Sequence, residues 1–305
     1  MNKVTDELLR MVSDFTGAFK GAFNIRENGE CAGRQSTDNI KIESKPNAPG
    51  LVIHIRPGTK GETVYIPACV TQGNINDLVY NDFYVGEGAD VTIVAGCGVH
   101  TEGEGEATHN GIHRFFLEKN ARIVYREKHV GTGGGTGQKR IDPVTEATLA
   151  QGASLEMDTV QLGGVDETYR KTWAKLAANA RLVVRERIMT DGDEHARTDF
   201  EVTLAGEDSG CDLVSRSVAR GQSHQEFYSS IKGLTRCTGH SECDAILAEN
   251  GTVTASPALE ASHVDAALIH EAAIGKIAGE QILKLRTLGL TEQEAEGKII
   301  EGFLR

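Results

Sequence analysis

The densest group of possible metal ligands lies in one eight-residue stretch, Cys237-Thr238-Gly239-His240-Ser241-Glu242-Cys243-Asp244. Its two thiols, imidazole and two carboxylates could coordinate iron, for which thiolate is the usual ligand and imidazole and carboxylate are alternatives. In an extended strand Cys237 and Cys243 would share one face, at most about 20 Å apart. Their spacing matches neither a zinc knuckle nor a ferredoxin loop. Spacing alone therefore leaves a metal or cluster role and a structural role equally open.

A second possible metal site is a group of four histidines: His100, His109, His113 and His129. Such a group could hold a catalytic metal, which would make the chain a metal-dependent hydrolase with a β-helix or jelly-roll fold. However, the stretch His113-Arg114-Phe115-Phe116-Leu117 is typical of a strand. A lone ring nitrogen in such places usually satisfies a backbone group, so this hydrolase is kept as an alternative.

Two other catalytic patterns are incomplete. Cys237 or Cys243 with His270 could form a nucleophile–base pair, but nothing nearby identifies an oxyanion hole. The segment Gly131–Lys139 is as rich in Gly as a phosphate-binding loop, yet Gln138 separates its last Gly from Lys139, where that motif requires Gly-Lys. We therefore expect residues 131–139 to form a flexible loop between strands.

Composition limits the function classes. The 305 residues carry a formal net charge of −12, which argues against nucleic acid or an anionic membrane as partner. The N-terminal residues lack a signal-peptide pattern, and no apolar run approaches the roughly 18 residues of a spanning helix. We expect a cytoplasmic protein whose cysteines are mostly reduced. These are Cys31, Cys69, Cys97, Cys211, Cys237 and Cys243.

The middle of the chain, residues 21–262, has short β-type stretches separated by Gly, Asn and Asp turns. A weak motif, [Gly/Asn]-Ala-x-[Val/Ile/Leu], recurs at steps of 32, 32 and 27 residues, with a looser copy at Gly210. A residue that tolerates a left-handed turn, followed by a strand, suits stacked coils. We predict a right-handed parallel β-helix in preference to a sandwich. The four copies begin at Gly88, Asn120, Gly152 and Asn179.

The two ends have helical spacing. An N-terminal segment, residues 1–20, should contain an amphipathic helix over 4–18 that buries Leu8, Met11, Val12 and Phe15. Residues 263–305 should form a C-terminal helical domain, with a capping box from Thr291 to Glu294 and a helix end at Gly289. Such a helical pair could cap the solenoid or form a docking surface. Its first stripe is Ile274, Ile277, Ala278, Ile282 and Leu285, and its second is Ala295, Ile299 and Phe303.

Several stretches resemble the SufB/SufD family of iron–sulfur cluster assembly scaffolds. The resemblance covers roughly residues 80–305 and is strongest from 205 onward. The chain is shorter than the usual SufB or SufD and resembles compact, single-type members. The stretches are Ser215–Val218, Ser223–Phe227, Cys237–Ile246, Ala255–Glu260, Leu268–Ile277 as a helix opening, Gly289–Ala295 and Ile300–Phe303.

The resemblance implies a non-enzymatic scaffold with a right-handed β-helix core. Such proteins pair through their β-helices, here as a homodimer, and dock a SufC-type ABC ATPase on the C-terminal helices. Cys243 matches the Cys of the SufB Cys-Asp motif, and His270 matches a His proposed to bind the cluster. The cofactor implied is a transient iron–sulfur cluster, expected to be 4Fe–4S.

The expected ligands of this cluster come from both subunits of a symmetric pair. Metal bonds are expected from Cys237, Cys243 and His270. The loop Leu247–Ser256 has no Cys, although SufB proteins carry one there. A SufD-like structural partner that holds no cluster is therefore a further alternative. The full set of expected cluster-binding residues is Cys237, His240, Glu242, Cys243, His270 and Glu271.

Overall fold

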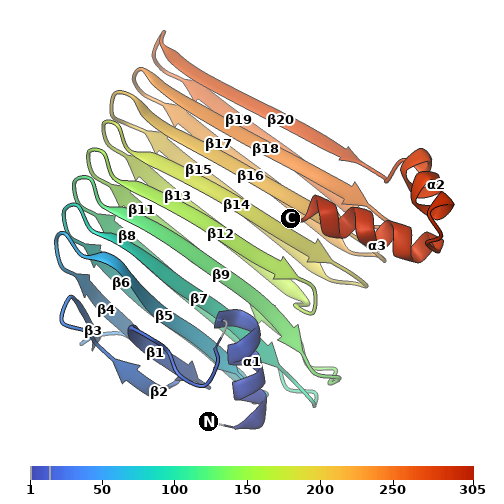
Figure 1. Cartoon of the computed structure of the whole chain (residues 1–305), viewed down its shortest axis with the longest axis horizontal. Coiled ribbons are helices and arrows are strands. Elements are labelled where there is room, and N and C mark those ends of the chain that lie inside the picture. Colours follow the sequence, from blue (N-terminus) through green and yellow to red (C-terminus); the bar gives the residue numbers. More distant parts are fainter. Residues whose placement is uncertain (1, 14) are drawn as a thin grey trace.

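The chain folds as a right-handed parallel β-helix of about eight turns, as the prediction had it (Figure 1). The structure is a computed structural model that describes residues 2–13 and 15–305. Each coil contributes one strand to each of two sheets, and successive coils pair in parallel and in register. Antiparallel pairs occur where the solenoid begins, between β1 and β2 and between β3 and β4.

The first sheet has the strand order β2-β1-β5-β7-β9-β12-β14-β16-β18-β20, and the second has the order β19-β17-β15-β13-β10-β8-β6-β4-β3, with β11 between β8 and β13. The elements are α1 (Lys3–Ser13), β1 (Ala22–Glu27), β2 (Glu30–Gln35), β3 (Ile40–Ser44), β4 (Gly50–Ile55), β5 (Lys60–Val70), β6 (Ile75–Val85), β7 (Asp90–His100), β8 (Ala107–Leu117), β9 (Arg122–Thr132), β10 (Lys139–Ile141), β11 (Val144–Leu149), β12 (Ser154–Leu162), β13 (Glu167–Leu176), β14 (Arg181–Thr190), β15 (His195–Leu204), β16 (Ser209–Ala219), β17 (His224–Gly233), β18 (Cys237–Leu247), β19 (Thr252–Ala261), β20 (Ala266–Gly275), α2 (Gly279–Thr287) and α3 (Glu292–Phe303).

The repeated motif marks the turn that leads into each strand of the first sheet. Its leading residues, Gly88, Asn120, Gly152 and Asn179, all have φ between 55° and 70°. The Ala that follows each of them is buried, because a larger side chain would not fit between stacked corners. The looser copy begins two residues earlier than expected: Asp208 (φ 55°) pairs in register with the Asn179 position, since Arg181 lies opposite Gly210.

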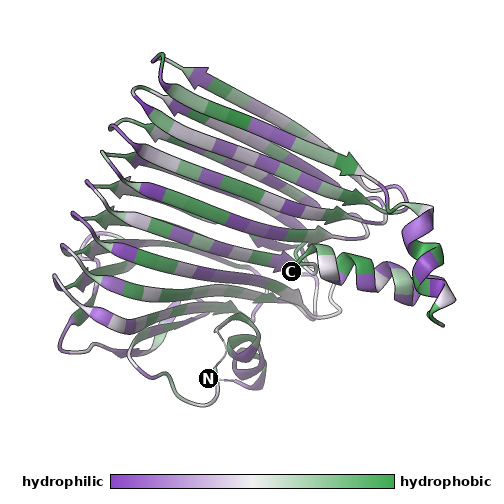
Figure 2. Cartoon of the chain, turned by 45° about the horizontal axis from the view of Figure 1, so that its top comes forward, coloured by the Kyte–Doolittle hydropathy of each residue, from purple (hydrophilic) through white to green (hydrophobic). Residues whose placement is uncertain are grey.

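Apolar and polar residues alternate along many of the strands (Figure 2). Buried apolar residues from Ala22 to Cys243 form one continuous cluster along the solenoid. The Gly-rich segment does connect strands, β9 and β10. It is packed rather than flexible: the Gly135 and Gly137 amides donate to the carbonyls of Thr101 and Gly103, at 3.0 and 2.9 Å. A Cβ on Gly137 would lie 2.1 Å from the Gly105 carbonyl oxygen, so the coil spacing requires Gly there.

The N-terminal helix is shorter than predicted. It ends at Ser13, and Phe15 lies beyond it against Phe19, with ring centroids 4.9 Å apart. Leu8 and Val12 face the core as expected, whereas Met11 is exposed. Residues 1 and 14 of the predicted segment lie outside the described residues.

The C-terminal boundary at residue 263 was wrong, because residues 266–275 form strand β20 rather than the start of a helix. The apolar residues of this segment suit either a helix or a strand. The segment forms a strand because the edge of β18 is free to pair with all ten of its residues. Helix begins at Gly279, so the stripe from Ile274 to Leu285 crosses a strand, a linker and α2. The predicted capping box at Thr291 and Glu294 is confirmed, as is Gly289 (φ 96°) after the end of α2.

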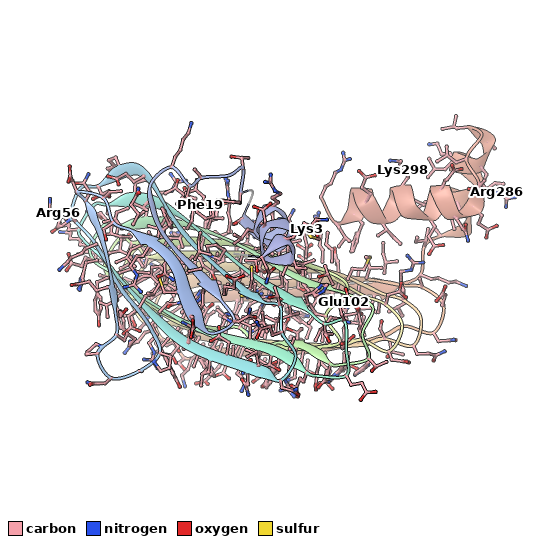
Figure 3. All side chains as sticks on the ribbon, turned by 90° about the horizontal axis from the view of Figure 1, so that it is seen from below. Lys3, Phe19, Arg56, Glu102, Arg286 and Lys298 are labelled. Atoms are coloured by element: carbon pink, nitrogen blue, oxygen red, sulfur yellow. The ribbon has the colours of Figure 1, made fainter. Side chains whose placement is uncertain are left out.

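The last coil of the solenoid, β19 and β20, is uncovered; we call it the terminal coil. The helices α2 and α3, on which Arg286 and Lys298 are labelled, lie at the side of the solenoid and not over its open end (Figure 3). The end of α3 lies against the first sheet, with Arg216 Nη1 3.5 Å from the carbonyl oxygen of Phe303. Inward-pointing residues of the terminal coil therefore remain exposed, among them Leu259 and Ile274, each at 41%. Both strands also present an unpaired backbone edge at this end.

Candidate functional site

The structure divides the six expected cluster-binding residues between two faces of the last two strands of the first sheet. Cys237, Cys243 and His270 point into the solenoid, and they are the three residues expected to bond metal directly. His240, Glu242 and Glu271 point outward from the same two strands. Alternation along a strand separates neighbours such as Glu242 and Cys243, so these six side chains cannot surround one cluster within a single chain.

The two thiols share a face, as their spacing predicted, but that face is interior. Cys237 and Cys243 are 2% and 1% exposed, and burial raises the pKa of both, that of Cys243 to about 12. A free thiolate is therefore disfavoured at either position, which speaks against the Cys–His nucleophile pair with His270. A bound metal would deprotonate the thiol, since coordination replaces the proton.

The surroundings of the two thiols differ. Cys237 lies against Gly233, where an added Cβ would be 2.8 Å from its Sγ, and beside Ala266 of the terminal coil. Cys243 instead ends a buried ladder of mostly polar residues at one register position. Only Cys243 thus combines burial with a polar neighbourhood one coil from the open end. The ladder runs Glu127, Thr159, Glu186, Ser215 and Cys243, from β9 to β18.

His270 lies in the terminal coil, directly above Ser241 and one inward position away from Ala272, which covers Cys243. Strand spacing puts the Cα atoms of Cys243 and His270 roughly 8 Å apart. The Nδ1 atom of His270 is buried and has no hydrogen-bond partner among residues 2–13 and 15–305. Burial lowers the pKa of His270, so its imidazole is held in the neutral form that coordinates metals.

The outward residues belong to a separate, charged surface. His240 Nδ1 lies 2.8 Å from Asp212 Oδ1, and burial together with Asp244 raises the pKa of Glu242. These residues line a hollow of about 560 Å³ on the first sheet, to which Arg305 contributes from the C-terminus. Several carboxylates of this hollow are paired with arginines: Arg185 lies 2.6 Å from Asp212, and Arg187 contacts Asp158.

The four histidines of the alternative hydrolase site do not converge in the described part of the chain. His109 Nδ1 lies 3.1 Å from Asp77, His113 Nδ1 lies 2.7 Å from the Tyr125 hydroxyl, and His100 lies 2.9 Å from Thr132. Burial lowers the pKa of His113 to about 4. These three rings are thus held by side chains rather than by the backbone groups expected. His129 lies 3.4 Å from both Glu127 and Arg170.

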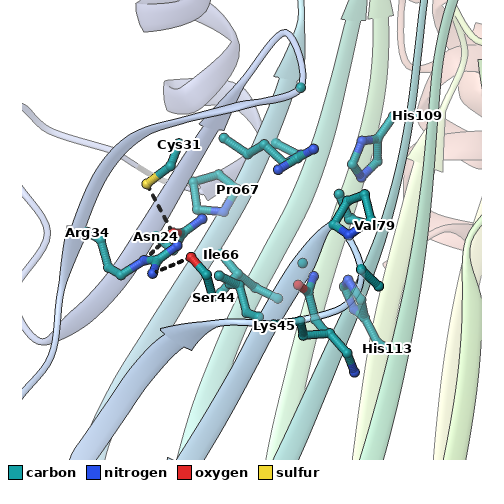
Figure 4. A pocket seen from close by; sticks show the side chains of 18 of the residues that line it. Asn24, Cys31, Arg34, Ser44, Lys45, Ile66, Pro67, Val79, His109 and His113 are labelled. Carbon is teal, nitrogen blue, oxygen red and sulfur yellow. Dashed lines mark hydrogen bonds between the residues drawn. The ribbon is translucent and has the colours of Figure 1, made fainter.

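His109 and His113 nonetheless border a cavity of about 290 Å³ at the N-terminal end of the solenoid (Figure 4). Their Nε2 atoms flank Gly111, within 3.4 Å of where its Cβ would be. Across the cavity, Cys31 and Arg34 both bond the side-chain oxygen of Asn24. The cavity mixes cationic and amide groups and has no convergent carboxylate, so it does not resemble a hydrolytic metal centre.

Sequence reasoning missed a buried ionic network at the centre of the solenoid. Arg170 lies between Glu127 and Glu186, at 2.8 and 3.4 Å, and all three side chains are at most 6% exposed. Ser215 donates to Glu186 at 2.6 Å. The signal lay in the alternation: Arg170 occupies an inward position between Thr168 and Thr172, where an apolar residue is usual. In the register of the coils, Glu186 pairs with Ser215 and Ser215 with Cys243, so Glu186 and Cys243 occupy the same inward position two strands apart.

No described helix combines the length and apolarity required to cross a membrane.

Comparisons with known proteins find one family. Residues 79–303 match the sequence model of the SUF system FeS cluster assembly, SufBD core domain. A protein of Archaeoglobus fulgidus named iron–sulfur cluster assembly SufBD family protein is 30% identical, over 84% of this chain and 68% of its own length. One of the same name from Methanothermobacter thermautotrophicus is 28% identical, over 86% of this chain and 64% of its own. The chain thus spans about two thirds of the length of these relatives.

A third relative, a SufBD family protein of Methanocaldococcus jannaschii, is 24% identical over 77% of this chain and 74% of its own length. The match to the core domain begins and ends within two residues of the region, 80–305, in which the resemblance was expected. Since that match covers most of the solenoid and both C-terminal helices, the chain belongs to the SufBD family of the SUF system for iron–sulfur cluster assembly.

Proposed function

We propose that this chain is a non-enzymatic scaffold that holds a nascent iron–sulfur cluster, its cargo, where the open ends of two solenoids meet. The observation that carries the proposal is the uncovered terminal coil, with His270 in it and Cys243 one coil beneath. The proposal extends the family's role in cluster assembly to particular residues of this chain.

The open end is suited to a second copy of the chain. It presents exposed apolar side chains from inward positions, among them Leu259 and Ile274, and two unpaired strand edges. An uncovered end of this kind is unstable in water and favours stacking on a matching end. A two-fold pair would bring two copies of Cys243 and of His270 toward one interface.

The ligands supplied there suit temporary binding. Two thiolates and two imidazoles hold iron less firmly than four thiolates, which is useful for a cluster that must leave. Cys237 can add a thiolate only after Ala266 moves away from it. The outward residues His240, Glu242 and Glu271 would not bind the cluster directly but would line the edge of the interface.

Cys243 must be uncovered before it can bind iron, and the chain offers a direct means. Strand β20 covers Cys243 with Ala272 and continues through residues 276–278 into α2. A SufC-type ABC ATPase docked on α2 and α3 would therefore pull on β20 when it closes on ATP. Displacement of β20 exposes the thiol and changes the interface in one motion.

The test is the iron and acid-labile sulfide content of protein purified without oxygen together with its ATPase. We expect Cys243→Ser to reduce both at least fivefold. Cys211→Ser is the matched control, because Cys211 is also buried, with its pKa also raised to about 12, but lies one strand further from the open end. Equal iron and sulfide contents in wild type and Cys243→Ser would contradict the proposal.

A second candidate function is that of a SufD-like partner, which docks the ATPase but holds no cluster. It is favoured by the absence of Cys from the turn between β18 and β19 and by the burial of both candidate thiols. Colourless protein that binds the ATPase and another SufBD chain would establish it. In either role the reduced cysteines suit the cytoplasm.

A further inference from the structure

Two histidines and a glutamate converge on the outer face of the second sheet, on β15 and β17, the two strands next to β19 of the terminal coil. His195 begins β15, His224 begins β17, and Glu226 lies two residues further along β17 on the same face. One side-chain ligand atom from each lies within 4.8 Å of the other two. In the described part of the chain this is the one group of three His, Cys, Asp or Glu residues close enough to share an ion.

The arrangement follows from the solenoid. His195 and His224 occupy the same register position on neighbouring parallel strands, so their rings stack with centroids 5.4 Å apart and planes inclined by 8°. Because a strand alternates, Glu226 rather than Gln225 joins His224 on the outer face. Two adjacent coils thereby present three ligands without any loop to order them.

Two contacts prepare His224 for coordination. Its Nδ1 lies 2.7 Å from the Thr252 hydroxyl of the next coil, which fixes the ring and leaves Nε2 free. That Nε2 lies 3.5 Å from Glu226 Oε1. Metal-binding histidines usually have such a second hydrogen bond on the other nitrogen. The His195 ring has no hydrogen bond in the described residues, so both its nitrogens are available.

A nearby cation limits the affinity without closing the site. Arg197 Nη1 lies 3.4 Å from Glu226 Oε2, but the guanidinium is held mainly by Asp199, at 2.9 and 3.1 Å. Glu226 can therefore turn toward an ion while Arg197 stays in place. Its positive charge would still oppose a bound cation.

We propose that His195, His224 and Glu226 bind a divalent first-row transition ion, with the remaining coordination positions open to water. Two imidazoles and one carboxylate are the ligands of catalytic zinc sites and of the facial triad of non-haem iron, whereas Mg²⁺ and Ca²⁺ prefer oxygen. The three side chains are half-buried, so an ion there remains accessible to an exchange partner. The proposal does not depend on where the cluster binds.

The test is a titration of the full-length protein with Co²⁺, followed by its visible absorption, and then displacement by Zn²⁺. Wild type should bind one Co²⁺ at this site, and His195→Ala and His224→Ala should each weaken that binding at least tenfold. His54→Ala is the control, since His54 is an outer-face histidine stacked on Tyr84. Glu226→Gln, which keeps the side-chain shape, tests the same site should an alanine variant fail to fold.

Arg197→Gln provides a change in the opposite direction. Loss of the competing guanidinium should tighten Co²⁺ binding severalfold, and unchanged or weaker binding would contradict the assignment of Glu226 as a ligand. Equal Co²⁺ affinity in wild type and in a His195→Ala, His224→Ala double variant would overturn the proposal. Cys243→Ser should leave this site unaffected, so the result is independent of the cluster proposal.

Discussion

At the scale of single residues, two features of His270 suit its proposed role as a ligand. Its Nδ1 is buried without a partner in the described residues, and burial lowers the pKa of its ring. An unpaired buried polar atom costs stability, and a bound metal would supply the missing partner. Cys243 is comparable: it ends a buried ladder that includes Glu186 and Ser215.

We therefore predict opposite effects of His270→Leu on stability and on function. Removal of the unpaired nitrogen should raise the free energy of unfolding by about 1 kcal/mol. Iron and sulfide contents should nevertheless fall severalfold. Chemical denaturation and metal analysis of the same preparation measure both. A destabilised variant with full cluster content would show that His270 is a packing residue.

How far these sites could be predicted from the sequence differs by residue. Side-chain spacing correctly put Cys237 and Cys243 on one face, because strand alternation is local. The spacing did not show that this face points into the solenoid, because that depends on which side of the first sheet the second sheet covers. His195 and His224 were missed because their proximity exists only once the register of β15 and β17 is known.

At the scale of elements, sequence patterns predicted the solenoid correctly but did not predict its last strand. Repeated turns predicted the solenoid because a residue with positive φ leaves a clear signature, as at Asn120 and Asn179. The strand β20 was not predicted, because residues 266–275 are apolar enough for a helix and only the edge of β18 makes them a strand. The same open edge now defines the proposed interface.

The terminal coil should control self-association. Leu259 stacks on Ile231 and is 41% exposed at the open end, so Leu259→Glu would bury a charge in a paired end. We expect this variant to be monomeric by light scattering at concentrations where wild type is dimeric. Leu283→Glu makes the same substitution on α2, where Leu283 is 61% exposed, and this variant should remain dimeric. Dimers of Leu259→Glu would place the interface elsewhere.

The interior near His113 should make folding sensitive to acid. The pKa of His113 falls from 6.5 to about 4 on burial, among His109, Glu127, His129 and Arg170. Between these pH values the unfolded chain binds the proton and the folded chain does not, so stability decreases as pH falls from 6.5 to 4. The loss from this group is roughly 3 kcal/mol at most.

His113→Gln keeps a polar group near Tyr125 but does not titrate there. Its unfolding free energy should depend less on pH between 6.5 and 4 than that of wild type, as followed by urea denaturation. Parallel pH profiles of the two proteins would show that His113 is not buried in the neutral form.

At the scale of the whole molecule, we propose separate tasks for the solenoid and the C-terminal helices. Helix α2 has no buried residue, and Leu283 and the C-cap residue Leu288 are 61% and 73% exposed, whereas α3 buries Ala295 and Ile300. Such a pair of helices has apolar surface available for a partner. Because only residues 276–278 separate α2 from β20, a partner bound to the helices would, under this proposal, act directly on the open end.

Docking of the ATPase should therefore depend on α2. Leu283→Lys combined with Leu288→Lys should weaken binding more than tenfold, because each buried Leu contributes roughly 1.5–3 kcal/mol. Leu162→Lys, on the solenoid and 50% exposed, is the control. Calorimetric titration of the purified ATPase measures the difference. Unchanged affinity in the double variant would move the docking surface away from these helices.

The central claim is that a cluster is shared between two open ends, and the most direct measurement is the iron and sulfide content of Leu259→Glu as a monomer. This variant keeps Cys243 and His270 but lacks the second chain. We predict a folded monomer, eluting as such without oxygen, with iron and sulfide reduced at least fivefold. A monomer that retains the wild-type content of both would contradict the account.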